Sequence, residues 1–380
     1  MKHVRGNLYL MKEINRSTIL SLLHREKSLS RAEIAQRTKL SATTISSLVD
    51  ELIKEGFIVE SGEKSSPGAG RRAISLEINR LNGFVISVGL GNRMFYFRMS
   101  NFHGEVITEL KKPATTGNTG VLESVKAGIE ELVKKSELQD FSMIKGMAIA
   151  SPGIIDEDNG MIEYSRYLNL KDFNIVDELQ ASYPIPIYVI NDTNAAAFAE
   201  YYLLSSPEIR NVLYVWVYDG VGAGIIINDQ IISGYKGSAG EVTYMSDYLF
   251  SDTYVLQQAQ KRALKHDANV VFHDIADVLE AYAIGVPWLE TLMDRSLLLM
   301  GKAIAVMINL IGPEQVILDG WFIDSPKCMQ KMHTYLRRLT LHGRYEPERV
   351  TTAKLGDKNY LIGATTLILH DLFKEKVLLT

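Results

Sequence analysis

Three stretches near the start of the chain place hydrophobic residues at helical spacing. Two of them lie at 15–23 and 30–38, and the third runs from Ser41 to residue 55. Ser30 and Glu33 stand three positions apart, as in a capping box, where each side chain satisfies a backbone N–H at the start of a helix. Because two helices across a short turn form a helix-turn-helix, we predict this motif over 30–55.

A short hairpin is predicted directly after these helices. Residues 57–59 and 73–76 can pair as strands, and the Gly- and Ser-rich stretch between them ends in Gly70-Arg71-Arg72. A hairpin tipped with arginines suits the narrow, electronegative minor groove of DNA. Small hydroxyl side chains on the preceding helix can bond phosphates and base edges in the major groove, although such a face is often only solvated. We predict a winged helix-turn-helix that contacts double-stranded DNA through Arg31, Ser41, Ala42, Thr43, Thr44, Ser46, Ser47, Arg71 and Arg72.

From residue 83 the pattern changes to short apolar strands that alternate with helical stretches. The first series predicts strands and a helix at 84–90, 94–100, 106–110, 120–135 and 144–150. A second series begins with a strand at 212–217 and ends with a helix at 361–372. Two successive α/β series predict a bilobal body with a cleft between its lobes. We place the domain bounds at 1–78, 79–200 and 201–380, the last lobe carrying the helices of dimerisation.

Composition fits a globular protein of the cytosol. The 380 residues are 46% hydrophobic and 23% charged, as in ordinary globular domains. Residues 1–12 lack the apolar core of a signal peptide, and the longest apolar run, 303–312, is about half of a membrane span. With Cys328 as its one cysteine, the chain cannot form an intrachain disulfide or a multi-thiolate zinc site. We expect a cytoplasmic protein with no metal and no cofactor.

Charge is divided unevenly along the chain. The formal net charge is −4, from 41 basic and 45 acidic residues. Residues 1–72 hold 13 basic and 8 acidic residues, which leaves 28 basic and 37 acidic residues in the remainder. A basic head on an acidic body suggests nucleic-acid binding by the head, although a chance imbalance on solvated faces gives the same numbers.

The chain resembles the ROK family, which is named for repressors, open reading frames and kinases, over nearly its whole length. Its head and body follow the order seen in the xylose- and N-acetylglucosamine-type repressors of that family. The resemblance implies an actin-like ATPase (ribonuclease H-like) fold for the α/β bilobal body, a sugar bound in its cleft, and a homodimer or homotetramer. The matching stretches are Asn15-Arg16-Ser17, Leu29-Ser30-Arg31-Ala32-Glu33-Ile34-Ala35, Val49-Asp50-Glu51-Leu52, Ser151-Pro152-Gly153-Ile154-Ile155-Asp156, Asn191-Asp192-Thr193-Asn194-Ala195-Ala196 and Gly220-Val221-Gly222-Ala223-Gly224-Ile225.

The kinases of this family grip ATP with short motifs that this chain lacks. They open the body with Asp-x-Gly-Gly-Thr, where this chain has Gly89-Leu90-Gly91-Asn92-Arg93. Their second phosphate loop has Gly-Thr-Gly in place of Tyr218-Asp219-Gly220, and an aspartate there repels a triphosphate. Their Gly-rich adenosine segment becomes Asp319-Gly320-Trp321, whose indole is expected to crowd a nucleotide. Because phosphoryl transfer depends on positioning and on charge clamps around the phosphates, we expect no kinase activity.

The chain matches the family's sugar-binding residues better than it matches the ATP-binding ones. Asn191 and Asp192 follow the strand predicted at 187–190, and in the family's kinases the aspartate at the position of Asp192 is the base for the sugar hydroxyl. Without ATP this carboxylate can act only as a hydrogen-bond acceptor. Glu241 matches the glutamate of the family's Glu-x-Gly-His, which also contacts sugar; an acid at the start of a helix is the alternative interpretation.

Two further sugar contacts are open to more than one interpretation. Thr243-Tyr244 replaces the family's Gly-His, and the cysteine cluster that usually follows is absent, so zinc is excluded on ligand count. Tyr244 either stacks on a sugar ring or packs in this loop. Asn169 is a candidate sugar contact, although Tyr167 occupies the place where the family often has asparagine.

Together these features predict a sugar-responsive transcriptional regulator that represses carbohydrate-utilisation genes. Its partners would be a double-stranded DNA operator and a sugar or sugar derivative, and the ligand would act by binding one arrangement of the lobes better than the other. The enzyme alternative is a hexose or N-acetylhexosamine kinase that carries a DNA-binding head. A third alternative is an interaction protein whose sugar cleft has collapsed and whose regulation comes from a partner protein.

Overall fold

A computed structural model of the protein describes residues 12, 15, 16, 18–64, 73–138, 141–204, 208–242, 249–266, 270–341 and 345–374. The chain forms two compact units, Met1–Asp192 with Leu361–Thr380, and Thr193–Tyr360. The first unit therefore holds the head, the first lobe and the last helix. The domain bounds taken from the sequence, 1–78, 79–200 and 201–380, stay predictions.

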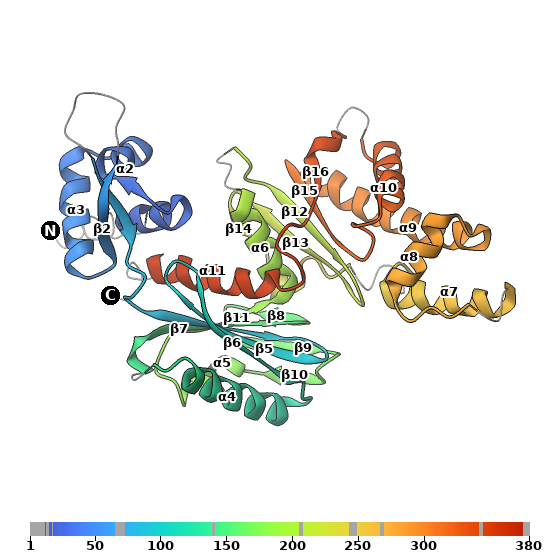
Figure 1. Ribbon diagram of the computed structural model, residues 1–380, viewed down its shortest axis with the longest axis horizontal. Coiled ribbons are helices and arrows are strands. Elements are labelled where there is room, and N and C mark those ends of the chain that lie inside the picture. Colours follow the sequence, from blue (N-terminus) through green and yellow to red (C-terminus); the bar gives the residue numbers. More distant parts are fainter. Residues whose placement is uncertain are drawn as a thin grey trace. The chain divides into compact units, whose positions relative to one another are not determined.

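The head is a helix-turn-helix followed by a small sheet (Figure 1). A helical stretch at 18–26 precedes the elements β1 (Leu29–Ser30), α2 (Arg31–Thr38), α3 (Ala42–Lys54), β2 (Ile58–Lys64) and β3 (Ala73–Ile78). The strands pair in the order β1-β3-β2. The predicted capping box is present, because Ser30 accepts from the backbone of Glu33 and the Glu33 carboxylate accepts from the backbone N–H of Ser30.

The head has its own hydrophobic core. Fully buried side chains come from the three helices at the predicted apolar positions: Ile19, Leu23, Ile34, Ile45 and Leu52. Full burial of such a side chain stabilises the fold by about 1.5–3 kcal/mol. Arg16 is also buried, and it pairs with Glu51 at 3.4 Å and with Glu55, so the first helix is fastened to α3.

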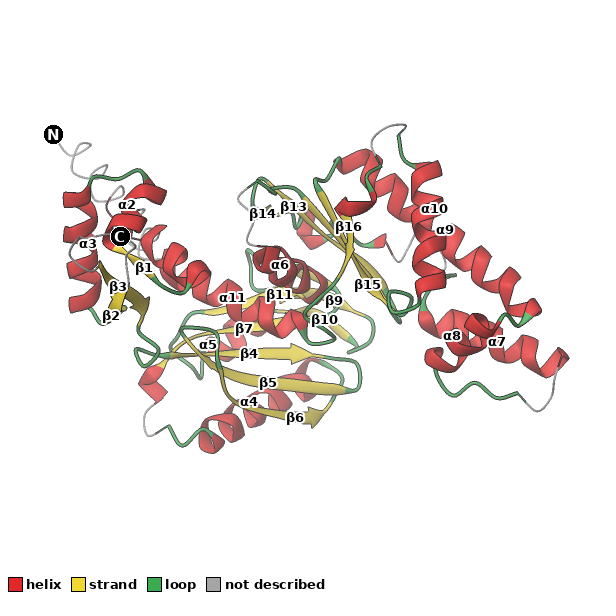
Figure 2. Cartoon of the chain, turned by 45° about the horizontal axis from the view of Figure 1, so that its top comes forward, coloured by secondary structure: helices red, strands yellow, loops and turns green. Residues whose placement is uncertain are grey.

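The first lobe is a mixed five-stranded sheet with helices on both faces (Figures 1 and 2). Its strand order is β11-β7-β4-β5-β6, in which β4, β7 and β11 are parallel and β4, β5 and β6 are antiparallel. These strands are β4 (Phe84–Leu90), β5 (Met94–Asn101), β6 (Val106–Pro113), β7 (Ile144–Ser151) and β11 (Ile187–Asn191). A smaller sheet has the order β10-β9-β8 and consists of β8 (Ile154–Asp156), β9 (Met161–Ser165) and β10 (Leu170–Phe173).

Three helices cover the five-stranded sheet of the first lobe. α4 (Asn118–Lys135) and α5 (Ile175–Gln180) lie on one face and α11 (Asn359–Lys374) lies on the other (Figure 1). Gly128 of α4 lets the helix approach the sheet, since a Cβ there would come within 2.1 Å of the Phe97 ring. On the opposite face, Thr365 of α11 donates to the hydroxyl of Ser87 in β4 at 3.1 Å.

The second unit repeats the plan with one five-stranded sheet and a group of long helices. Its strand order is β14-β13-β12-β15-β16, from β12 (Val212–Val217), β13 (Val221–Ile227), β14 (Gln230–Ile231), β15 (Gln315–Gly320) and β16 (Val350–Thr352). Its helices are α6 (Asp192–Leu204), α7 (Asp252–His266), α8 (Ile275–Ile284), α9 (Pro287–Ile311) and α10 (Pro326–Leu339). The chain crosses between the units at 192/193 and 360/361, each time within the first three residues of a helix, α6 or α11.

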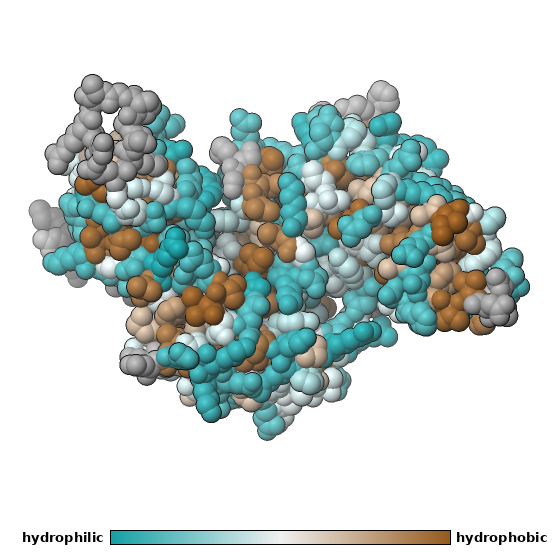
Figure 3. Space-filling model, in the orientation of Figure 1, coloured by the Kyte–Doolittle hydropathy of each residue, from teal (hydrophilic) through white to brown (hydrophobic). Residues whose placement is uncertain are grey.

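Apolar side chains are mostly buried in the described residues. Each unit has its own large apolar cluster, and the face drawn in Figure 3 is mainly hydrophilic with smaller hydrophobic groups between. Every helix in the described ranges is too short or too polar to span a membrane.

Candidate functional site

The predicted DNA-reading helix presents small polar side chains at its start. Ser41 caps α3 by accepting from the backbone N–H of Thr44 at 3.1 Å. Ser41, Ala42 and Thr43 are exposed at this end, and Ser47 is exposed one turn further on. Thr44 and Ser46 are half-buried, so Ala42, Thr43 and Ser47 are the predicted contacts most open to a partner.

Arg31 makes hydrogen bonds and ion pairs within the head. Its guanidinium donates to the carbonyl of Ser46 at 3.3 Å and pairs with Asp50 at 2.8 Å and with Glu60 at 3.4 Å. These partners belong to α3 and β2, so Arg31 joins three elements of the head. Arg71 and Arg72, the other predicted basic contacts, lie outside the described residues.

Lys39 is a basic residue that is not among the predicted DNA contacts. It occupies the turn between α2 and α3 with φ +58°, and its side chain is exposed. A lysine in this turn lies at the start of the reading helix, where a phosphate would be attracted both by the ammonium and by the helix dipole. Its place between two helical stretches was the signal that could have identified it.

The first part of the predicted sugar site lies at the carboxyl ends of two parallel strands. β11 and β7 pair in parallel with Asn191 opposite Ser151, and ligands of open α/β sheets bind at such strand ends. Asn191 is buried, and its amide donates to the carbonyl of Gly153 at 2.9 Å. Asp192 follows as the first residue of α6 and is half-buried, a position where the helix dipole stabilises a carboxylate.

The loop that Asn191 holds depends on Gly153. This residue has φ +115°, and a Cβ there would come within 2.2 Å of the carbonyl oxygen of Tyr164. Backbone cannot yield to that contact, so the loop after β7 requires glycine. Asn191 therefore shapes the site through its amide nitrogen, which the sequence alone did not indicate.

Asn169 occupies the turn between β9 and β10. Ser165 and Leu170 pair across this turn, and Asn169 has φ +50° with an exposed side chain. Asparagine tolerates the left-handed region better than most residues. A turn-forming role thus accounts for Asn169, and its contact with a sugar stays a prediction.

Glu241 belongs to the second unit, whereas Asp192 closes the first part of the first unit. Gly240, which precedes it, has φ +81°, and a Cβ there would come within 1.8 Å of the carbonyl oxygen of Ala223 in β13. The carbonyl of Gly240 also accepts from the backbone N–H of Ala223 at 2.9 Å. The backbone at Glu241 is therefore fixed beside β13. Tyr244 lies outside the described residues.

A buried carboxylate with three donors lies at the segment that the resemblance aligns with the kinases' Gly-rich adenosine segment. Asp319, at the end of β15, is 4% exposed. It accepts from the hydroxyl of Tyr218 at 2.8 Å, from the hydroxyl of Tyr214 at 2.5 Å and from the amide of Asn359 at 3.0 Å. Burial, together with the neighbouring Asp319, raises the pKa values of Tyr214 and Tyr218, so both keep their protons and donate.

Tyr218 and Asp319, which the resemblance aligns with two separate parts of the family's ATP site, are hydrogen-bonded to each other. Asp219, which lies between Tyr218 and Gly220, accepts from the backbone N–H of Gly220 at 3.0 Å. Trp321 is buried in the core of the second unit and donates from its indole nitrogen to the carbonyl of Phe250 at 3.0 Å. Side chains of the protein thus engage one another at these positions.

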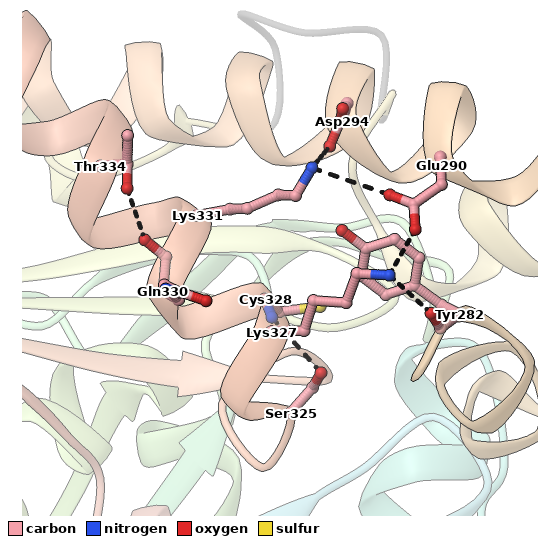
Figure 4. Close-up of polar contacts among 9 residues, drawn as sticks. All are labelled: Tyr282, Glu290, Asp294, Ser325, Lys327, Cys328, Gln330, Lys331 and Thr334. Carbon is pink, nitrogen blue, oxygen red and sulfur yellow. Dashed lines mark hydrogen bonds and ion pairs between the residues drawn. The ribbon is translucent and has the colours of Figure 1, made fainter. Parts of the chain in front are cut away.

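A charged cluster in the second unit ties α8, α9 and α10 together (Figure 4). Lys327 donates to the carbonyl of Tyr282 at 2.8 Å, pairs with Glu290, and lies 3.9 Å from the centre of the Tyr282 ring. Lys331 pairs with Asp294 and reaches Glu290 at 3.8 Å. Because each ammonium already has an acidic partner, we assign this cluster to helix packing.

Comparisons with known proteins agree with this arrangement of head and body. The ROK family profile matches residues 85–246 and 251–371, and the profile of the winged helix-turn-helix DNA-binding domain matches 13–59. A putative xylose repressor of Caldicellulosiruptor sp. (strain Rt8B.4) is 28% identical over 97% of this chain and 98% of its own length.

Solved structures confirm the predicted fold class. The crystal structure of a ROK family transcriptional regulator, a homologue of the Escherichia coli Mlc protein, superposes with a TM-score of 0.83 at 23% identity and covers 97% of this chain and 98% of its own. A ROK hexokinase from Thermus thermophilus superposes with a TM-score of 0.63 at 21% identity and covers 77% of this chain and 99% of its own. The protein belongs to the ROK family, and it joins the sugar-kinase-like body of that family to an N-terminal winged helix-turn-helix DNA-binding domain.

Proposed function

We propose that the protein is a sugar-responsive repressor that binds an operator through its winged head and does not phosphorylate sugar. The observation that carries this proposal is the bonded pair of Tyr218 and Asp319, 2.8 Å apart, at two positions of the ATP grip. A DNA-binding head on a body that has lost its phosphate grip has a regulatory use and no evident enzymatic one.

The loss of kinase chemistry follows from charge and from space. Asp319 is a buried carboxylate that accepts from two hydroxyls and an amide, all of them neutral groups. A negative charge at the nucleotide end repels a triphosphate, and the repulsion is stronger in a poorly solvated site. Tyr218 adds a ring where the family's kinases have glycine. Since phosphoryl transfer needs clamps around the phosphates, these replacements favour a regulator over the alternative of a sugar kinase.

For the DNA contacts we propose the start of α3 and the wing. Ala42, Thr43 and Ser47 are exposed and short, so they would let α3 lie deep in the major groove. Ser41, Thr44 and Ser46 would lie at the edge of this surface, and Arg31 would hold α2 against α3 through Asp50 and against β2 through Glu60. Arg71 and Arg72 would reach the minor groove. A homodimer or homotetramer in the cytoplasm would read a palindromic operator with two such heads.

For the effector we propose a monosaccharide or its derivative, held by carboxylates and amides. Asp192 would accept from sugar hydroxyls, and Asn191 would fix the loop beside it. Glu241 is a further candidate contact, as are Asn169 and Tyr244. D-Xylose is the first probe to use, because a relative that matches over nearly the whole chain is named a putative xylose repressor.

Thermal unfolding with and without ligand tests this proposal. The full chain would be heated in the presence of D-xylose, N-acetylglucosamine, glucose and a wider set of saccharides, and separately with ATP and Mg²⁺. A ligand that binds only the folded protein raises the apparent stability by mass action. We expect one sugar to raise the melting temperature and ATP to leave it unchanged. Stabilisation by ATP together with sugar-dependent release of ADP would favour the kinase.

A further inference from the structure

A turn of the first lobe reaches into the DNA-reading head. This turn joins β5 to β6 and consists of Asn101-Phe102-His103-Gly104-Glu105. Phe102 is 2% exposed and His103 is 9% exposed, although surface turns of this length usually face solvent. Both side chains are covered by the head, which lies in the same compact unit.

The turn is braced by its own first residue. The side-chain oxygen of Asn101 accepts from the backbone N–H of His103 at 2.9 Å and from that of Glu105 at 3.1 Å. The amide nitrogen of Asn101 donates to the Glu105 carboxylate at 2.8 Å. Gly104 takes φ +79°, which this tight geometry allows at low cost for glycine. The turn therefore holds Phe102 and His103 in a defined orientation.

Three separate elements of the head meet this turn. The ring of Phe57, which follows α3, stacks on Phe102 with centroids 6.4 Å apart and an interplanar angle of 9°. The Nε2–H of His103 donates to the carbonyl of Ile78, at the end of β3, at 2.6 Å. Lys27, which follows the first helix, donates from its ammonium to the carbonyl of His103 at 3.2 Å. The contacts thus come from both ends of the helix-turn-helix and from the wing.

The covalent connection alone would not fix the head. Residues 79–83 separate β3 from β4; the backbone N–H of Asn79 donates to the carbonyl of Phe57 at 2.8 Å, and Arg80 pairs with Glu105 at 2.8 Å on the surface. An exposed ion pair of this kind contributes about 0–1 kcal/mol. The stacked rings, the buried histidine and the Lys27 bond add contacts between the head and a turn that lies beyond this connection.

We propose that the β5–β6 turn is a positioning element that fixes the orientation of the DNA-reading head, with Phe102 and His103 as its positioning residues. The proposal rests on the proposed function, because orientation matters only if two heads read two half-sites of one operator. A head that swings freely still binds a single half-site. Two heads bind together with high avidity only when their geometry matches the spacing of the half-sites.

The experiment compares matched pairs of variants in the full chain. Phe102→Leu replaces the ring that meets the head, whereas Phe95→Leu replaces a similarly buried ring within the lobe core, in the strand β5 that precedes the turn. His103→Leu removes the donor to Ile78, whereas His103→Gln can restore it through its amide. A DNA duplex is first selected from a random pool with the wild-type chain, and its half-sites are then moved apart by one or two base pairs.

We expect Phe102→Leu and His103→Leu to bind the selected duplex about tenfold or more weakly, because avidity is lost. Their affinity for an isolated half-site should change by less than about twofold, and they should tolerate the longer spacings better than wild type does. His103→Gln and Phe95→Leu should behave as wild type. If Phe102→Leu and His103→Leu both keep the wild-type preference for the spacing of the half-sites, the proposal is overturned.

A second measurement tests the contact between the β5–β6 turn and the head without DNA. Limited proteolysis of the same variants should cut within residues 79–83 faster in Phe102→Leu and His103→Leu than in Phe95→Leu. Equal cutting rates in all variants would overturn the proposal whatever the DNA result. If wild type selects no duplex at all, the proposed function fails, and the cutting rates still decide whether the turn restrains the head.

Discussion

Acidification should destabilise the head through one buried histidine. His24 lies in the first helix, is 7% exposed, and has its pKa lowered to about 3. The main cause is burial, which penalises the charged ring, and the positive charges of Lys27, His103 and His370 add to it. These groups come from the helix end, from the β5–β6 turn and from α11, so His24 is surrounded from three elements of the first unit.

The sign and size of the effect follow from the two states. In the unfolded chain the pKa of His24 is near its ordinary value of 6.5, so below this pH the unfolded state binds a proton that the folded state does not. Its contribution to stability is therefore complete above about pH 6.5 and is lost as the pH falls towards 3. Each pH unit in this window changes stability by about 1.4 kcal/mol, which amounts to about 2 kcal/mol between pH 7 and pH 5.

Hydrogen exchange of the backbone amides in residues 18–26 measures this loss locally. Rates are corrected for the intrinsic pH dependence of exchange, and wild type is compared with His24→Leu, which cannot take up the proton. Between pH 7 and pH 5 the free energy of opening should fall further in wild type than in His24→Leu, and the difference between the two losses should be about 2 kcal/mol. His273→Leu, at an exposed position of the second unit, should keep the wild-type difference. Equal losses in wild type and His24→Leu would refute the reasoning.

Three further predictions concern the body and the wing. Tyr218→Phe removes one donor to the buried Asp319 carboxylate, so the free energy of unfolding of the second unit should fall by about 1.5–3 kcal/mol. Urea unfolding followed by tryptophan fluorescence measures this, since the second unit holds all three tryptophans, and an unchanged midpoint would contradict it. Asp192→Asn should weaken the effector sugar by about tenfold to a hundredfold in calorimetry while operator binding without sugar stays intact; wild-type sugar affinity would place the sugar elsewhere. Arg71→Ala with Arg72→Ala should lower operator affinity and flatten its dependence on salt in gel-shift titrations; an unchanged salt slope would remove the wing from the interface.

Local chemistry made the head predictable from the sequence. The capping box of Ser30 and Glu33 fixes the start of α2 within four residues, and Ser41 does the same for α3. The strand at 187–190 followed by Asn191 and Asp192 was equally local, and β11 (Ile187–Asn191) matches the predicted strand to within one residue. These features depend on residues close in the chain, so a single sequence contains them.

Long-range partners could not be read in the same way. Tyr218 and Asp319 are 101 residues apart, and each was interpreted separately as a lost kinase residue. Thr365 of α11 bonds to Ser87 of β4, 278 residues away, which places the last helix in the first unit. The bond between His103 and Ile78 likewise depends on how head and lobe meet.

The central claim is that this ROK body senses sugar without consuming ATP. The direct measurement is the affinity of the full chain for its selected duplex, followed by fluorescence anisotropy, as each of the saccharides is added with and without MgATP, while ADP release is recorded in the same samples. The account predicts that one sugar changes the affinity to the same extent with and without MgATP, and that no ADP appears. Sugar-dependent ADP release, or an affinity that no saccharide changes, would contradict it.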